Sequence, residues 1–276
     1  MLGLTELAAR EGTWVFDYAS IRITPGRGAH PLRQLLGEVV VPLAAIESIT
    51  HEPDRKGGTL RLRPRAGADP LTQAVGGALP EGADPFRLAV EPTASASAET
   101  FASGVRDARL VAQVPDGPTT EYLLPGPPVP CSTSAADGTA GFDGARLRLE
   151  WGWAAESAKR SGGTRELALS ELAGVEWTVK HVRFRTTGAA TGLAPSHDPN
   201  CLVLWGFKKD VATSALLAAA VTARLPHPYA AAPAAQPDTD QDTVLRRLRE
   251  LGELRRDGVL TDDEFTAAKQ ALLRRL

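Results

Sequence analysis

Apolar and polar residues alternate along many short stretches of this chain, and each such stretch predicts a strand with one buried and one solvated face. The clearest stretches are 21–23 (Ile-Arg-Ile) and 147–149 (Leu-Arg-Leu). Similar stretches lie at 39–41, 59–63, 86–90 and 201–205, whereas 98–110 and 212–225 are compatible with helices. Several short strands followed by one helix predict a small antiparallel barrel or sandwich that the helix closes.

The same pattern occurs twice in the chain. Residues 12–23 and 138–149 are separated by 126 positions and are identical at six of twelve places. At this offset the apolar positions of 41–49 match those of 167–175, and later matches pair 60–63 with 182–185 and 101–110 with 216–225. Because the matches keep their order and the gaps fall in Gly- and Pro-rich places, the sequence predicts an internal duplication.

The length of 276 residues favours two domains and an appendage. A Pro-rich stretch at 125–130 and an Ala- and Pro-rich stretch from 226 predict extended linkers. The predicted organisation is a first repeat at 1–114, a Pro/Gly-rich linker at 115–136, a second repeat at 137–226, an Ala/Pro linker at 227–240 and a helical hairpin at 241–276.

Apolar residues recur at helical spacing on both sides of Gly258 in the tail. A glycine at this position can form the left-handed cap that ends the first of two helices. Thr261 and Glu264 have the spacing of a capping box that begins a second helix. A hairpin of about 34 residues is too small to fold unaided, so its apolar face should pack on a second copy of the chain or on one of the repeats. We expect self-association through Leu245, Leu248, Leu251, Leu260, Phe265 and Leu272.

The openings Phe16-Asp17-Tyr18 and Phe142-Asp143-Gly144 resemble a bacterial family of unknown function, DUF4429, and the strand pattern resembles the bacterial pleckstrin-homology-like (PH-like) fold. The resemblance implies a mainly β fold with α: two tandem PH-like small antiparallel β-barrels or sandwiches, each closed by a C-terminal helix. It implies no activity. Residues 251–265 resemble the short C-terminal domain (SHOCT), which implies oligomerisation or another interaction.

Catalytic chemistry has no support in the sequence. The five histidines are scattered, and neither a His-x-x-Glu-His nor a Cys-x-x-Cys pattern occurs. The run Ser196-His197-Asp198 is contiguous, whereas a catalytic triad converges in space from separate segments. We therefore expect a protein that is not an enzyme and has no cofactor and no metal. Cys131 and Cys201 indicate no disulfide framework, although a single disulfide stays open.

Charge and hydropathy set further bounds. The formal net charge of −2 argues against a whole-chain electrostatic grip on nucleic acid. The first ten residues lack the features of a signal peptide, and no run of 18 apolar residues occurs. We expect a cytoplasmic protein, with peripheral attachment to a membrane left open.

Two sets of residues are candidates for binding. The first lies in the segment after the opening strand of each repeat, a region that in lipid-binding PH domains often supplies cations to phosphate; a solvated loop explains the same residues more simply. Its members are Arg27, Arg33, Lys159, Arg160, Trp151 and Trp153.

The second set is a group of arginines that alternation places opposite the apolar face of the strands. A solvated sheet face with nearby carboxylates explains them more simply than a nucleic-acid or ligand face does. Its members are Arg22, Arg61, Arg63, Arg146, Arg148, Arg183 and Arg185.

Taken together, these features predict a non-enzymatic binding or scaffold protein whose repeats present loops and sheet edges and whose tail multiplies the valency. The expected partner is a copy of the chain or another protein. One alternative is a peripheral membrane sensor that binds anionic headgroups through the basic loops. A second, weak nucleic-acid binding by the outer-face arginines, is disfavoured by the net charge.

Overall fold

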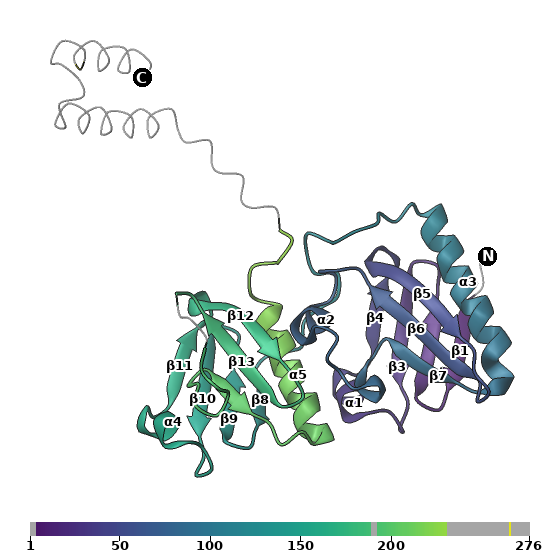
Figure 1. The fold of residues 1–276 in the computed structure, drawn as a ribbon. Helices are drawn as coiled ribbons and strands as arrows, with labels where there is room; N and C mark the ends of the chain where they lie inside the picture. Colours follow the sequence, from purple (N-terminus) through teal and green to yellow (C-terminus); the bar gives the residue numbers. More distant parts are fainter. Residues whose placement is uncertain (1–3, 189–191, 231–264, 266–276) are drawn as a thin grey trace. The chain divides into compact units, whose positions relative to one another are not determined.

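The computed structural model describes residues 4–188, 192–230 and 265 (Figure 1). The chain divides into two compact units, Met1–Tyr229 and Ala230–Leu276. Every helix and strand described below belongs to the first unit, which holds both repeats.

The first repeat consists of two antiparallel sheets and a helix. Their strands follow one another in chain order, so every connection joins neighbours. The first sheet contains β1 (Thr5–Ala9), β2 (Gly12–Phe16), β3 (Ser20–Pro25) and β4 (Val39–Pro42); the second contains β5 (Ile46–Glu52), β6 (Gly58–Pro64) and β7 (Arg87–Val90); helix α3 (Ser95–Val111) follows.

The second repeat has the same plan, so the fold is mainly β with two tandem domains, as predicted. Short 3-10 helices at η1 (Leu43–Ala45) and η4 (Leu169–Glu171) join the two sheets at positions separated by the repeat offset. Its elements are β8 (Cys131–Ser134), β9 (Gly138–Phe142), β10 (Arg146–Trp151), β11 (Arg165–Ala168), β12 (Leu172–Trp177), β13 (His181–Thr186), β14 (Cys201–Val203) and α5 (Lys208–Thr222).

Shorter helices decorate the sheets. Helices α1 (Pro31–Leu36) and α4 (Ser157–Ser161) follow the third strand of their repeats and correspond to one another. Helix α2 (Pro70–Val75), with the 3-10 turn η2 (Glu81–Ala83), lies between β6 and β7; a further 3-10 turn, η3 (Pro92–Ala94), leads into α3. Between β13 and β14 the described residues contain no helix that corresponds to α2.

The Phe-Asp motif of each repeat forms the turn between the second and third strands. The Asp17 carboxylate accepts hydrogen bonds from the backbone N–H of Ala19 (3.0 Å) and of Ser20 (2.6 Å). Asp143 caps its turn in the same way. Backbone hydrogen bonds, led by that from Ser20, lower the pKa of Asp17. The next residue takes a positive φ, 68° at Tyr18 and 109° at Gly144, which explains the glycine of the second copy.

The buried residues form two cores, and one of these cores contains residues from both repeats. One core lies between the two sheets of the first repeat and α3, and Trp14 and Phe101 are fully buried in it. The other surrounds α5, and it includes Leu32, Leu71 and Val75 from α1 and α2 of the first repeat. The repeats therefore share a core and pack as one unit.

The structure shifts the predicted boundaries. Strand β8 lies inside the segment that we predicted as a linker at 115–136, because it pairs with β9 as β1 pairs with β2. The preceding residues are fastened to the first repeat: the N–H groups of Leu123 and Leu124 both donate to the carbonyl of Ala68. The start of the second predicted linker is also held, since His227 Nε2 lies 2.8 Å from the carbonyl oxygen of Gly67.

Three further expectations concern the cysteines, membrane-spanning helices and the C-terminal hairpin. Both cysteines, Cys131 and Cys201, are free. In the part of the chain that the structure describes, no helix is long and apolar enough to cross a membrane. The predicted hairpin lies outside the described residues apart from Phe265, which is helical and half-buried.

Candidate functional site

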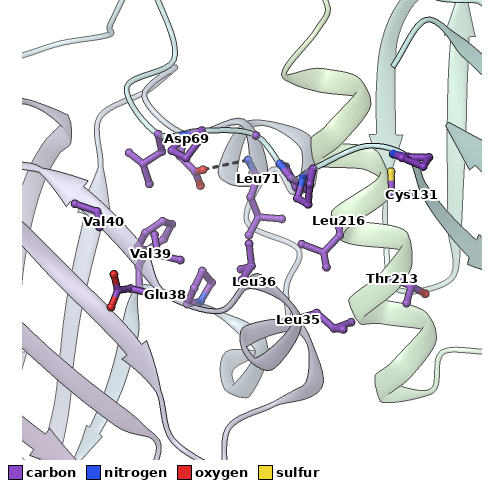
Figure 2. Close-up of a pocket in the computed structure, with 18 of the residues that line it drawn as sticks. Leu35, Leu36, Glu38, Val39, Val40, Asp69, Leu71, Cys131, Thr213 and Leu216 are labelled. Carbon is purple, nitrogen blue, oxygen red and sulfur yellow. Dashed lines mark hydrogen bonds between the residues drawn. The ribbon is translucent and has the colours of Figure 1, made fainter. Parts of the chain in front are cut away.

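A cavity of about 470 Å³ lies between the two repeats (Figure 2). Its walls come from α1, β4 and α2 of the first repeat and from β8 and α5 of the second, and segment 124–130 completes it. Most of the lining is apolar, with Leu35, Leu36, Val39, Leu71 and Leu216 among the contributors. A concave, mainly apolar cavity with a few polar groups is the usual form of a ligand site.

Two polar groups of this inter-repeat pocket, those of Asp69 and Thr213, have structural tasks. The buried Asp69 carboxylate caps α2 and accepts hydrogen bonds from Thr72 N (2.8 Å) and Thr72 Oγ1 (2.6 Å). Burial raises the pKa of Asp69, and the Thr72 hydrogen bonds oppose that rise. Thr213 Oγ1 lies 2.7 Å from Thr133 Oγ1 and so joins α5 to β8.

The thiol in the pocket is poorly suited to nucleophilic chemistry. Cys131 is half-buried at the start of β8. Burial raises the pKa of the Cys131 thiol, which keeps it in the protonated form at neutral pH. The pocket can therefore hold a ligand by shape and apolar contact, but its thiol is not activated.

The segment that crosses the pocket depends on one glycine. A Cβ atom on Gly126 would collide with the Cβ of Ala223, so only glycine lets the segment come this close to the end of α5. The segment is held beyond both ends, by the hydrogen bonds of Leu124 and by the pairing of β8 with β9. The Pro-rich stretch is thus a wall of a site.

Two sheet edges border the pocket. Strand β4 is the last strand of its sheet and pairs with β3; strand β8 is the last strand of its sheet and pairs with β9. Residues 39–40 of β4 and 131–132 of β8 line the cavity. Edge strands carry backbone N–H and C=O groups that can accept another strand.

The basic residues that the sequence predicted as a binding set differ in burial. Arg27 is exposed in the loop after β3, and Arg160 is exposed on the short helix α4. Arg33 and Lys159 are instead buried, and both are engaged inside the protein. The four cations therefore do not form one binding set, which corrects the expectation that all of them lie on loop surfaces.

Arg33 and Lys159 are the same position in the two repeats, separated by 126 residues. Lys159 Nζ lies 2.6 Å from Asp137 Oδ2 and also donates to the carbonyl oxygens of Pro195 and Cys201. Arg33 Nη1 lies 3.2 Å from Glu11 Oε2, and Glu11 and Asp137 are again separated by 126 residues. Each repeat thus holds its short helix, α1 or α4, to the turn before its second strand with a buried cation and a carboxylate, a structural use of these charges.

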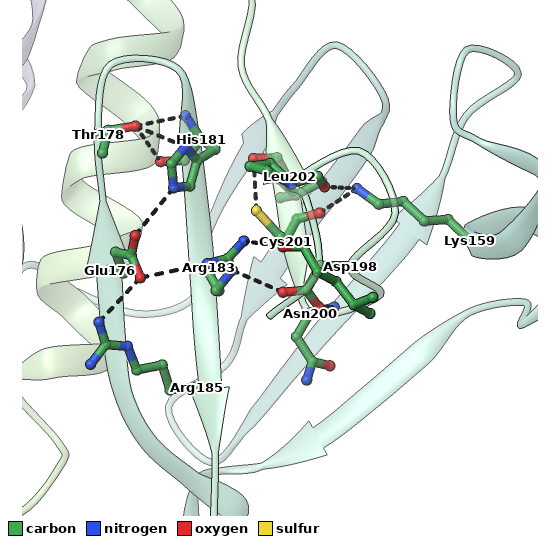
Figure 3. Close-up of polar contacts among 12 residues, drawn as sticks. Lys159, Glu176, Thr178, His181, Arg183, Arg185, Asp198, Asn200, Cys201 and Leu202 are labelled. Carbon is green, nitrogen blue, oxygen red and sulfur yellow. Dashed lines mark hydrogen bonds and ion pairs between the residues drawn. The ribbon is translucent and has the colours of Figure 1, made fainter. Parts of the chain in front are cut away.

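Most of the outer-face arginines are ion-paired. Arg183 Nε lies 2.8 Å from Asp198, and Arg185 reaches Glu176 at 3.1 Å (Figure 3). The hydrogen bond from Arg185 is the largest cause of the lowered pKa of Glu176. Among the described residues, two members of the set form no ion pair; those that do form one are Arg22, Arg146, Arg148, Arg183 and Arg185. Carboxylates therefore neutralise most of these arginines, which differ in exposure: the Arg185 side chain is 56% exposed and that of Arg183 only 11%.

The two loop tryptophans differ in environment. Trp151 is half-buried with its ring 4.8 Å from Lys159 Nζ, an interaction that helps to hold the buried ammonium. Trp153 is 89% exposed. Trp205, which the sequence did not single out, is also exposed.

Sequence reasoning missed the inter-repeat pocket. A signal existed in the apolar pairs Leu35-Leu36 and Val39-Val40, because consecutive apolar residues break the alternation of a half-buried surface. Among residues 4–188, 192–230 and 265, no group of three His, Cys, Asp or Glu side chains could hold a metal ion. The leucines of the predicted oligomerisation face lie outside the described residues.

Comparison with known families agrees with the duplicated architecture. The model of the family described as "Domain of unknown function (DUF4429)" matches residues 14–106 and again 140–222. The chain therefore belongs to this family, of which it carries two copies. The model of the Short C-terminal domain (SHOCT) matches residues 246–273. No curated protein matches the chain.

Proposed function

We propose that this chain is a non-enzymatic scaffold protein that binds an extended apolar segment of a partner protein in the inter-repeat pocket. The observation that carries the proposal is the position of the pocket, which is apolar and is bordered by the free edges of β4 and β8. An extended peptide can add to a sheet edge through its backbone while alternate side chains enter an adjoining pocket. A volume of about 470 Å³ suits a few apolar side chains.

Several properties of the pocket support binding over catalysis. Its buried carboxylate, Asp69, is committed to capping α2. Its thiol, Cys131, has a raised pKa. A catalytic site needs a nucleophile or base that faces the bound ligand with a suitable pKa, and neither group offers this.

The SHOCT tail supports a role in assembly. Its predicted apolar face would associate with a second copy of the chain, and two or more pockets would then bind a multivalent partner with greater avidity. Static light scattering on the full chain and on a 1–240 truncation tests this step. Equal monomeric masses for both proteins would contradict self-association. The PH-like classification and the cytoplasmic location stay predictions of the sequence.

Selection from a displayed library of random peptides tests the pocket. We expect the full chain to select peptides with spaced apolar residues. The variant Leu35→Asp should lose them, because Leu35 lines the pocket and is 57% exposed at its mouth. The matched control Leu110→Asp changes a leucine that is 79% exposed on α3, and it should bind as the wild type does.

Two results would overturn the proposal. One is equal retention of selected peptides by Leu35→Asp and by the wild type, which would place binding elsewhere. The other is a failure to select any peptide while a small apolar dye binds in a Leu35-dependent way. That result would indicate a small-molecule site in the same pocket.

A further inference from the structure

Two exposed aromatic residues and three exposed lysines lie on adjacent segments of the chain where β14 leads into α5. Trp205 is 58% exposed and Phe207 is 68% exposed. Lys208 and Lys209 begin α5, and Lys180 lies in the turn between β12 and β13; all three are exposed. These five residues are called the aromatic–lysine patch.

Backbone contacts hold the two segments of the patch together. The N–H of Leu204 donates to the carbonyl oxygen of Lys180 at 2.8 Å. A Cβ atom on Gly206 would stand 3.7 Å from the carbonyl oxygen of Val179, so residues 179–180 lie beside 204–206. The turn itself is fixed by Thr178 Oγ1, which accepts hydrogen bonds from the backbone of Lys180 and His181.

The charge of the patch is not neutralised within the protein. Among the described residues, none of Lys180, Lys208 and Lys209 forms an ion pair, unlike most arginines on the strands. Half of the six lysines in the chain lie here, and the one acidic neighbour in sequence, Asp210, is half-buried. The field of Lys208 reaches His30, where burial first and Lys208 second lower the pKa of the imidazole.

We propose that the aromatic–lysine patch docks the protein onto an anionic lipid surface. Tryptophan and phenylalanine partition into the boundary between headgroups and acyl chains, where they bury apolar area and where the Trp N–H can still reach polar partners. Lysines beside them are attracted by the negative surface potential of anionic lipids. The site lies apart from the inter-repeat pocket, whose lining includes none of the five residues.

A lipid surface fits this patch better than a nucleic acid does. Binding along a nucleic-acid strand needs a basic groove that follows the backbone over several phosphates. The strand arginines that could extend such a groove are held by carboxylates, as Arg183 and Arg185 are. Two exposed aromatic residues and three exposed lysines on adjacent segments instead suit a flat array of anionic headgroups.

Binding should be reversible and sensitive to salt. Each lysine close to an anionic surface strengthens partitioning by about fivefold, so three lysines and two aromatic rings give an attachment of moderate strength. Added salt screens the surface potential and should weaken it.

Co-sedimentation of the full chain with liposomes tests the proposal. We expect binding to phosphatidylcholine mixed with phosphatidylglycerol at low salt, and little binding to phosphatidylcholine alone. The double variant Lys208→Gln/Lys209→Gln should lower the partition coefficient at least about tenfold. The double variant Trp205→Ala/Phe207→Ala should do the same through loss of apolar burial.

Matched controls separate this patch from other exposed residues. Trp153→Ala removes a tryptophan that is 89% exposed elsewhere, and Arg27→Gln/Arg160→Gln removes two exposed cations outside the patch. Both controls should bind as the wild type does. The proposal is overturned by a lack of binding to the mixed liposomes at low salt, or by equal losses in patch and control variants. Salt-sensitive binding to single- or double-stranded DNA through the patch, without liposome binding, also overturns it.

Discussion

The closing helices of the two repeats occupy matching places in the chain but have different surroundings. Helix α3 buries one face, which includes Phe101 and Val105, and leaves Leu110 and Val111 exposed at its end. Helix α5 is buried almost all round from Val211 onward. A helix with apolar or small residues on every face is typical of an element with neighbours on all sides.

The difference follows from a helix that, among the described residues, only the first repeat has. Helix α2 lies between β6 and β7 and packs with α1 against α5 of the second repeat. Among the described residues, the second repeat has no helix between β13 and β14 that could cover α3 in return. The two repeats therefore share one plan, and α1 and α2 of the first repeat cover α5 of the second, which makes the two bodies interdependent. Both helices also line the pocket between the repeats.

The buried ion pairs give the largest expected contrast between the repeats. Asp137→Ala should destabilise the protein by about 3–5 kcal/mol, because it leaves the fully buried Lys159 ammonium without its carboxylate. Glu11→Ala should cost less, about 1–3 kcal/mol, because the buried Arg33 loses a carboxylate that is itself 30% exposed but keeps its hydrogen bond to the carbonyl oxygen of residue 11. Urea unfolding of both variants measures the contrast, and equal losses would show that the pairs are equivalent after all.

The closing helices should respond differently to the loss of a leucine. Leu217→Ala in α5 removes a fully buried side chain and should cost about 2–5 kcal/mol. Leu110→Ala in α3 removes an exposed one and should change the free energy of unfolding by less than about 0.5 kcal/mol. Thermal unfolding followed by circular dichroism reports both values. A large loss at Leu110 would mean that α3 also packs on another surface.

The turns after the Phe-Asp motifs should differ by a smaller amount. Gly144→Ala should destabilise by about 1–2 kcal/mol, because φ at this position is 109° and the new Cβ would approach Val129 Cγ2. Tyr18→Gly should change stability by less than about 1 kcal/mol, since relief of the positive φ offsets the lost contact with Phe16. Calorimetry on the two variants decides whether the turns are equivalent, and a greater loss at Tyr18 would reverse their order.

The smallest expected effect concerns pH. Burial and Lys208 lower the pKa of His30 below its ordinary value of 6.5. Between these two pKa values the unfolded chain binds a proton at His30 and the folded protein does not. The stabilisation is complete above pH 6.5 and is lost as the pH falls from there through the folded-state pKa. The His30→Asn side chain can still accept the hydrogen bond from Leu32 N. The free energy of unfolding of this variant should therefore match that of the wild type at about pH 8. It should fall less than that of the wild type when the pH is lowered to about 5. Parallel stability curves for the two proteins would contradict this.

Much of the architecture could be predicted from the sequence because its physical causes are local. Alternation predicts β3 and β10, whose buried and exposed positions follow a period of two. The collinear matches predict the duplication, which the paired sheets and the two family matches confirm. The arginines on the strands were expected to lie opposite the apolar face, and Arg22 and Arg148 do so.

The site was not predictable in the same way, because it depends on distant parts of the chain. A basic residue in a loop such as Lys159 has the same sequence signature whether it is exposed or buried beside Asp137. The Pro-rich segment has the composition of a spacer, and only the close approach of Gly126 to Ala223 shows that it forms a wall of the pocket. No local pattern reports that Trp205 and Lys180 lie side by side.

The sequence by itself determined the strands and the two copies, since these depend on residue type and spacing along the chain. Only the tertiary structure decided which charges are buried, which helix is covered, and where a pocket opens between the repeats. The physical reason is that burial and ion pairing depend on the packing of segments such as α2 and α5, which lie more than a hundred residues apart.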